Sequence, residues 1–161
     1  MKNNNKGFSL VELIIVIAIM AVLVGVLAPT YLQYVEKSKK SNDVQTVDSI
    51  VNALEICAID PEVQVAGDWD LTITITTTGL TYVDSKSAAA TDTKMELAMR
   101  AIVPETTKLK STKWGGDLVI KAAPVADGYG KITITMNTSG AANAANKAFK
   151  EFSNHAKIAF S

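Results

Sequence analysis

The stretch KGFSLVELIIVIAIMAVL, residues 6–23, decides how the rest of this chain is interpreted. A glycine is followed by a long apolar run, yet Glu12 stands inside that run. From Phe8 to Ala28 only Ser9 and Glu12 are polar. As a helix this segment extends about 31 Å, close to the hydrocarbon thickness of a bilayer. The run therefore predicts one membrane crossing that contains a carboxylate.

Three interpretations account for this N-terminus. The first is an ordinary signal peptide, with Lys2 and Lys6 as its basic region and VLA at 26–28 as its cleavage site. Pro29 would then follow the cut directly, and Glu12 would have no reason to lie in the apolar region. The second is an unprocessed membrane anchor, in which Glu12 lies near the membrane edge and reaches for water. Neither interpretation explains the glycine and the carboxylate together.

The third interpretation uses a short basic leader that ends in Gly7, followed by Phe8, Glu12 and an unbroken apolar helix. This arrangement resembles the class III signal of type IV pilins and pseudopilins. The resemblance covers about residues 6–36, because many type IVa pilins carry a proline and two tyrosines at the positions of Pro29, Tyr31 and Tyr34. It implies that a membrane-embedded prepilin peptidase removes residues 1–7, cutting between Gly7 and Phe8, and then methylates the new amine of Phe8.

The resemblance also gives Glu12 a role. A carboxylate in hydrocarbon costs several kcal/mol unless it is paired. By resemblance, Glu12 pairs with the Phe8 amine of a neighbouring subunit and so sets the register of a growing filament. The alternative is that Glu12 pairs only with the Phe8 amine of its own chain.

The helical pattern continues beyond the membrane segment, which we place at residues 8–29, into an amphipathic half at residues 30–60. Pro29 removes a backbone donor and crowds the carbonyl of Gly25, which predicts a kink between them. The amphipathic half carries apolar residues at steps of three and four, which should face a sheet: Val44, Val47, Ile50, Val51, Leu54, Cys57 and Ala58. The charged segment EKSKKSND at 36–43 is interpreted as a solvated collar, with lipid headgroups or a neighbouring subunit as the alternative contact. Asp60-Pro61 is expected to end the helix.

Residues 61–161 predict a globular head. Strict alternation in WDLTITITTT at 69–78 indicates a half-buried strand, and further strands are expected at 80–84, 117–125 and 131–137, with a turn at Asp127-Gly128. A short helix is expected within 91–105, with Thr93 and Glu96 as a capping box and an apolar face of Met95, Ala98, Met99 and Ile102. An alanine-rich helix is expected at 139–160, with Phe149, Phe152 and Ala156 on one side. The fold class is therefore α+β: the pilin-like arrangement of a long N-terminal helix on an antiparallel sheet of three or four strands, with short extra helices.

Composition and motifs give little support to other chemistry. The 161 residues carry 16 basic and 16 acidic side chains, so no electrostatic footprint for nucleic acid is expected. Cys57, the only cysteine, is expected to be buried and inert, and His155, the only histidine, to be a solvated surface residue. Lys108, Lys110, Lys113 and Trp114 are interpreted as an exposed loop rather than a polyanion site. The acidic residues Asp60, Glu62, Asp68 and Asp70 match no calcium loop. We expect no metal, no cofactor and no catalytic set, and therefore not an enzyme.

The resemblance implies a structural subunit of a type IV pilus. It would be made as a single-pass membrane precursor, processed by the prepilin peptidase, and polymerised with copies of itself by the pilus assembly machinery into a surface fibre for adhesion, aggregation, twitching motility or biofilm formation. A pseudopilin of type II secretion or competence and a minor pilin remain alternatives; Glu151 is the only acid after Gly140, which disfavours the acidic C-terminal calcium loop of secretion pseudopilins. Outside the family, an enzyme on a membrane stalk and a soluble secreted binding module remain open. The lack of a disulfide and the Asn/Lys-rich leader favour a Gram-positive, low-GC source.

Overall fold

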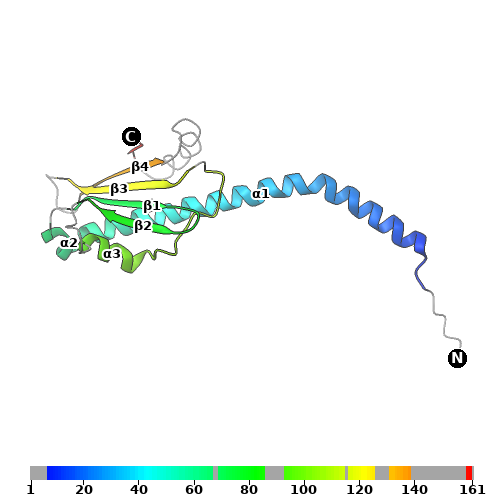
Figure 1. Ribbon diagram of the computed structural model, residues 1–161, viewed down its shortest axis with the longest axis horizontal. Helices are drawn as coiled ribbons and strands as arrows, with labels where there is room; N and C mark the ends of the chain where they lie inside the picture. Colours follow the sequence, from blue (N-terminus) through cyan, green and yellow to red (C-terminus); the bar gives the residue numbers. More distant parts are fainter. Residues whose placement is uncertain are drawn as a thin grey trace, which may run out of the picture. The chain divides into compact units, whose positions relative to one another are not determined.

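The computed structural model of the chain describes residues 7–66, 69–85, 93–114, 116–125, 131–138 and 159–160. The chain divides into two compact units, Met1–Ser38 and Lys39–Ser161. Both contain part of helix α1, which runs from Leu10 to Ile59 as a single element (Figure 1). The sequence predicted this helix from Phe8, so its observed start is two residues later.

Helix α1 ends where the sequence predicted, but a second helix follows at once. In α2 (Pro61–Ala66), the first residue is a proline, whose fixed φ suits a helix start. The carboxylate of Asp60 accepts a hydrogen bond from the N–H of Glu62 at 2.8 Å and so caps α2. From the sequence, Asp60-Pro61 predicted only the end of a helix, so α2 is an addition to the predicted fold.

The head contains a sheet whose strands are β1 (Leu71–Ile75), β2 (Leu80–Asp84), β3 (Leu118–Pro124), β4 (Ile132–Thr138) and β5 (Ala159–Phe160). The order is β2-β1-β3-β4-β5, and the first four strands pair in antiparallel fashion. All four were predicted from the sequence. The Thr76 N–H bonds the Gly79 carbonyl at 2.8 Å to close the β1–β2 turn. A side chain at Gly79 would meet the Glu105 carbonyl at 3.1 Å, which explains the glycine.

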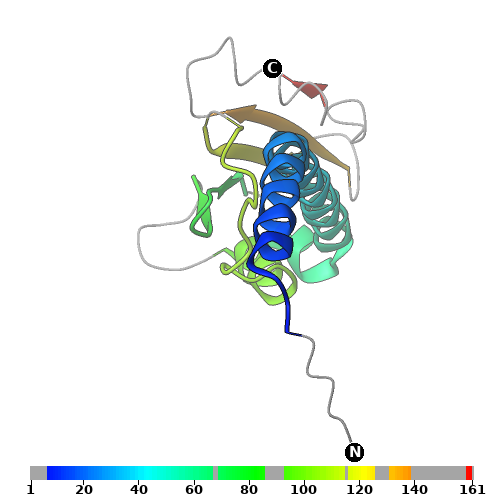
Figure 2. The ribbon, with the colours of Figure 1, turned by 90° about the vertical axis from the view of Figure 1, so that its right-hand side faces the viewer.

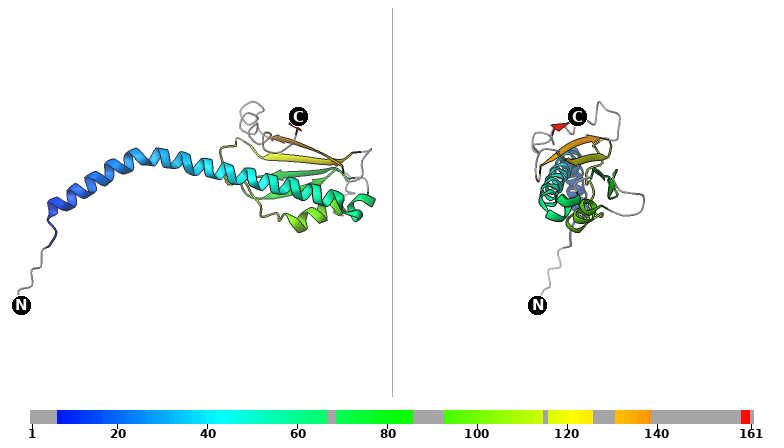
Figure 3. Two further views of the ribbon diagram at one scale, coloured as in Figure 1. Left: turned by 180° about the vertical axis from the view of Figure 1, so that it is seen from behind. Right: turned by 90° about the vertical axis from the view of Figure 1, so that its left-hand side faces the viewer.

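The core lies between the sheet and residues 43–58 of α1. On the inner face, Leu71, Ile73 and Ile75 alternate with half-buried threonines, as the sequence predicted. The predicted stripe of α1 packs against them: Val47, Ile50, Leu54, Cys57 and Ala58 are buried, and Val44 and Val51 are partly buried. Figures 2 and 3 show the sheet curving around the cyan to teal part of α1, with β4 on one side and β2 and α3 on the other. The predicted α+β fold is confirmed, and it matches the type IV pilin fold.

Two predictions about helices need correction. Helix α3 (Lys94–Ile102) forms and is capped by Thr93, but Ile102 is 50% exposed while Glu96 is buried. Residues 159–160 form β5, which pairs in parallel with β4, so the predicted helix at 139–160 does not include them. A strand can add to the open edge of β4, where the unpaired backbone groups of an edge strand are available.

Several sequence predictions lie outside the described residues. They are the turn at Asp127-Gly128, Asp68 of the acidic stretch, the surface position of His155, the apolar face of Phe149, Phe152 and Ala156, and Glu151.

Candidate processing and assembly site

The start of α1 is fixed by a hydrogen-bonded cap. The N–H of Ser9 donates to Oε2 of Glu12 at 2.9 Å, and the N–H of Leu13 bonds the Ser9 carbonyl at 3.3 Å. Ser9 is therefore the N-cap residue, and Glu12, three positions later, occupies the place of the carboxylate in a capping box. Its negative charge also lies at the positive end of the helix dipole.

This cap changes the interpretation of Glu12. The sequence predicted a Phe8 amine as the partner of the carboxylate, either in a neighbouring subunit or in its own chain, but in the structure the partner is the Ser9 N–H. The signal was available, because Ser9-Leu10-Val11-Glu12 has the same S/T-x-x-E spacing as Thr93 and Glu96. This spacing lies at the start of an apolar run, where a carboxylate also has the pattern of a charge in hydrocarbon.

The predicted cleavage position lies just outside the helix. Gly7, Phe8 and Ser9 have no regular secondary structure, and Phe8 is 94% exposed. Peptide bonds inside a helix are hydrogen-bonded and wound, whereas the Gly7–Phe8 bond is neither part of α1 nor covered. A side chain added at Gly7 would meet nothing within 4 Å.

The first unit exposes an unusual amount of apolar surface. From residue 10 to residue 32, every large apolar side chain is exposed, from 48% at Val16 to 72% at Leu10. The described part of the chain has one helix long and apolar enough to cross a membrane, and its most apolar 18-residue window has no buried residue. A soluble monomer rarely leaves so large an apolar surface uncovered.

The two predicted kink residues are both helical. Pro29 lies inside α1, and the helix continues past it. Gly25 has open space around it, since an added Cβ would meet nothing within 4 Å. The glycine at this position is therefore not required by packing within the chain.

A buried carboxylate fastens the loop after α3 to α1. Asp43 is 0% exposed and accepts three hydrogen bonds: from the N–H of Lys110 at 2.7 Å, from the N–H of Ser111 at 2.9 Å, and from Nε1 of Trp114 at 2.8 Å. We call this set of contacts the Asp43 clamp. Two predictions are wrong for one residue each, because Asp43 is buried although most of the collar is exposed, and Trp114 is 2% exposed although the lysines of its loop are exposed.

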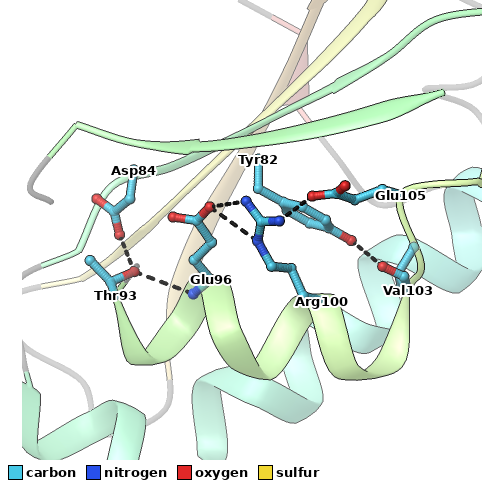
Figure 4. Close-up of polar contacts among 7 residues, drawn as sticks. All are labelled: Tyr82, Asp84, Thr93, Glu96, Arg100, Val103 and Glu105. Carbon is cyan, nitrogen blue, oxygen red and sulfur yellow. Dashed lines mark hydrogen bonds and ion pairs between the residues drawn. The ribbon is translucent and has the colours of Figure 1, made fainter. Parts of the chain in front are cut away.

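A second polar cluster joins α3 to β2 (Figure 4). The buried Glu96 carboxylate accepts a hydrogen bond from Arg100 Nη2 at 2.7 Å, and Arg100 also pairs with Glu105. The predicted capping box would instead have placed this carboxylate at the start of α3. The guanidinium carbon of Arg100 lies 5.6 Å from the centre of the Tyr82 ring. The Tyr82 hydroxyl donates to the Val103 carbonyl at 2.5 Å.

The other end of this cluster holds the start of α3. Thr93 Oγ1 accepts from the Glu96 N–H at 3.2 Å and donates to Asp84 at 2.7 Å. Burial raises the pKa of Tyr82 to about 12; the Arg100 cation opposes this shift and the Glu105 carboxylate adds to it. We interpret this arrangement as a structural brace between α3 and β2, since each of these polar groups is hydrogen-bonded or ion-paired to another residue of the cluster.

The acidic residues predicted to lack a metal loop serve local structure. Asp60 caps α2, Glu62 pairs with Lys94 at 3.2 Å, and Asp70 accepts from the Ser85 hydroxyl at 3.0 Å. Among the residues that the structure describes, no group of three or more His, Cys, Asp or Glu is placed to hold a metal ion. Cys57 is buried, as predicted.

Comparison with known proteins agrees with this arrangement. Residues 2–28 match the family described as the prokaryotic N-terminal methylation motif. The chain is 37% identical over 60 residues to the type IV major fimbrial protein FimA of Dichelobacter nodosus, a match that covers 37% of this chain and 38% of the relative.

Two further relatives show the same pattern. The chain is 34% identical over 81 residues to fimbrial protein Q of Moraxella bovis, covering 48% of this chain and 52% of the relative. It is 34% identical over 58 residues to prepilin peptidase-dependent protein D of Escherichia coli K12, covering 36% and 40%. The matches thus span about half or less of each relative. No solved structure matches the chain. The motif, the fimbrial relatives and the fold together support the interpretation of this chain as a type IV pilin.

Proposed function

We propose that this chain is the structural subunit of a type IV pilus, made as a membrane precursor and polymerised into a fibre on the cell surface. The exposed apolar surface of residues 10–32 carries the proposal. A surface of that size needs a cover, which lipid supplies before assembly and copies of the same helix supply in the fibre. A fimbrial subunit supports adhesion, aggregation, twitching motility or biofilm formation and needs no cofactor.

In this proposal the prepilin peptidase cuts the bond between Gly7 and Phe8 and methylates the Phe8 amine. The exposed, non-helical segment before Leu10 supports this, because the scissile bond is reachable without unwinding α1. The pilus assembly machinery then extracts the processed chain from the membrane. Residues 1–7 act as the leader, and Gly25 and Pro29 give the helix a place to bend.

Glu12 has two successive roles in this scheme. Before cleavage the Glu12 carboxylate caps α1 by accepting a hydrogen bond from the Ser9 N–H. Ser9 directly follows Phe8, so the carboxylate is held close in sequence to the Phe8 nitrogen. After cleavage that nitrogen is a cation, and Glu12 pairs with the amine of Phe8, either in its own chain or in the neighbouring subunit of the fibre. If the partner is the Phe8 amine of the neighbouring subunit, this ion pair sets the register between subunits, because the Glu12 charge is paired at only one axial position of the neighbour.

The first test is the intact mass and N-terminal sequence of protein sheared from the cell surface. A chain of 154 residues (161 minus 7) that starts at methylated Phe8 is the expected result. A start at Pro29 would mean a soluble secreted domain, and an intact Met1 would mean an unprocessed anchor. Either would refute the proposal.

Two substitutions separate the roles of Glu12. Glu12→Gln keeps an oxygen that can cap the helix but removes the charge, since glutamine also serves in a capping box. Glu12→Ala removes both. We expect both variants to be processed and membrane-inserted but to give few fibres. Normal fibres from Glu12→Gln alongside failed assembly of Glu12→Ala would show that the cap matters and the charge does not.

A further inference from the structure

The Asp43 clamp brings together lysines from two distant parts of the sequence. Lys110 lies next to α1, where its Nζ donates to Oδ1 of Asn42 at 3.1 Å. On the α1 side, Nζ of Lys40 lies 4.8 Å from the centre of the Trp114 ring. Segments about seventy residues apart in sequence therefore share one surface.

The position of these lysines on α1 follows from helical geometry. Lys39 and Lys40 precede Asp43 by four and three residues, so they lie on the same face of the helix, one turn nearer the N-terminus. That face is the one the loop contacts, because Asp43 receives the N–H groups of Lys110 and Ser111.

We propose that Lys39, Lys40, Lys110 and Lys113 form one basic surface, and that this surface binds the anionic phosphates of phospholipid headgroups while the precursor is in the membrane. The inference rests on the proposed function, because it requires the precursor stage. Lys39, Lys110 and Lys113 are exposed, and Lys40 is partly covered by Trp114.

Charge supports this assignment. Asp43, three residues after Lys40, is fully buried and its carboxylate accepts three N–H donors, so it does not face a ligand. Two partly buried acids, Glu36 and Asp117, flank the segments and each interacts with another group. The exposed charge of these segments is therefore dominated by lysine.

The sequence of α1 favours lipid as the partner. Lys39 comes five helical residues after Tyr34, whose side chain is still 69% exposed at the end of the exposed apolar segment. Lysines directly after a membrane span are attracted to anionic headgroups, and the attraction falls off within a screening length. A nucleic-acid strand would need an aromatic face for stacking, and Trp114 is buried with its indole N–H bonded to Asp43.

The test compares lysine reactivity in two membranes. The full-length precursor is placed in nanodiscs of phosphatidylcholine alone, or of phosphatidylcholine with phosphatidylglycerol, and exposed amines are acylated and located by mass spectrometry. We expect Lys39, Lys110 and Lys113 to react about fivefold more slowly in the anionic discs, the factor that one lysine gains near an anionic surface. About 1 M salt should remove the difference, since it shortens the screening length to about 3 Å.

Matched controls are present in the same head. Lys121 on β3 and Lys131 before β4 are both exposed, and their reactivity should be the same in both discs. The double variant Lys110→Gln/Lys113→Gln should restore the reactivity of Lys39, whereas Lys121→Gln/Lys131→Gln should not. The first pair preserves the Asp43 clamp, because Asp43 contacts the backbone N–H of residue 110 and not its side chain.

Each other outcome overturns the inference. Equal reactivity in the two membranes, or slowing that salt does not reverse, would show that anionic lipid is not bound. Protection only in assembled fibres would identify a contact between subunits, and protection by added DNA alone would identify a polyanion site. Alkaline carbonate gives a separate readout: release of the precursor would refute the membrane stage of the proposed function, whereas an inserted precursor without protection refutes only this inference.

Discussion

Removing the carboxylate of Asp43 should detach the loop after α3 and destabilise the head. Three donors lose their acceptor in Asp43→Ala. The N–H of Lys110 lies at the partly exposed edge of the clamp, where water can replace the carboxylate, but the N–H of Ser111 and the indole N–H of Trp114 are buried. Each buried donor left unsatisfied costs about 1–3 kcal/mol, so we expect the free energy of unfolding to fall by about 4 kcal/mol.

The assay is urea unfolding of the full-length protein in detergent micelles. Fluorescence reports on Trp69 and Trp114, which are both buried, and far-ultraviolet circular dichroism reports on the sheet. Following both signals separates loss of the clamp around Trp114 from unfolding of the whole head. A loss of about 4 kcal/mol is a large part of the stability of a domain this size.

Two further variants serve as controls for Asp43→Ala. Asp48→Asn removes a carboxylate from the same helix at a partly exposed site, and we expect a change within about 0.5 kcal/mol. Asp43→Asn keeps one acceptor oxygen but turns an amide N–H₂ toward the donors, so it should lose most of the same stability. If Asp43→Ala unfolds within about 1 kcal/mol of the wild type, the clamp does not stabilise the head and the reasoning is wrong.

Three further predictions concern the brace around α3 and the membrane half of α1. Arg100→Ala removes the charged hydrogen-bond donor of the buried Glu96 carboxylate and should cost about 2–3 kcal/mol in urea unfolding. Arg100→Lys should recover part of the loss, and an unchanged midpoint would contradict this. Because the pKa of Tyr82 is raised from 10.0 to about 12 in the folded chain, the stabilisation linked to its neutral phenol is complete below pH 10 and is lost between pH 10 and about 12; this loss should be absent in Tyr82→Phe, as measured by unfolding at each pH. In Gly25→Ala the added methyl group meets no other atom, and the helical conformation of α1 should become more stable by about 0.5–1 kcal/mol. Fibres of normal yield and shape by electron microscopy would show that flexibility at this glycine is not needed for assembly.

The sequence predicted the parts of the fold that are recorded in short-range patterns. The alternation of Leu71, Ile73 and Ile75 with threonine identified β1 and its buried face, because side chains of a strand alternate between two sides. Apolar residues at steps of three and four in α1 identified the face that packs on the sheet, because such residues lie on one side of a helix. Helix α2 was missed although Asp60 before Pro61 is a helix-start pattern as well as a helix end.

The candidate site was less predictable, because its decisive contacts are of two different kinds. The cap between Ser9 and Glu12 is local and its spacing was visible. The burial of Asp43 depends on a loop 67–71 residues later in the chain, and no local period distinguishes Asp43 from the exposed charges beside it. The β5 pairing also joins distant segments, which is why residues 159–160 were assigned to a helix.

The length of the loop that the Asp43 clamp closes also affects how the chain folds during synthesis. The clamp cannot form until Trp114 has been made, 71 residues after Asp43. At ~5–20 residues per second, this interval lasts about 4 to 14 seconds, whereas a helix forms in about a microsecond. Until then the amphipathic half of α1 lacks the loop that fastens it to the head, and such a helix is only marginally stable without its packing partners. We expect the head to be exposed to aggregation during that delay, because the apolar face of the helix is made before its packing is complete.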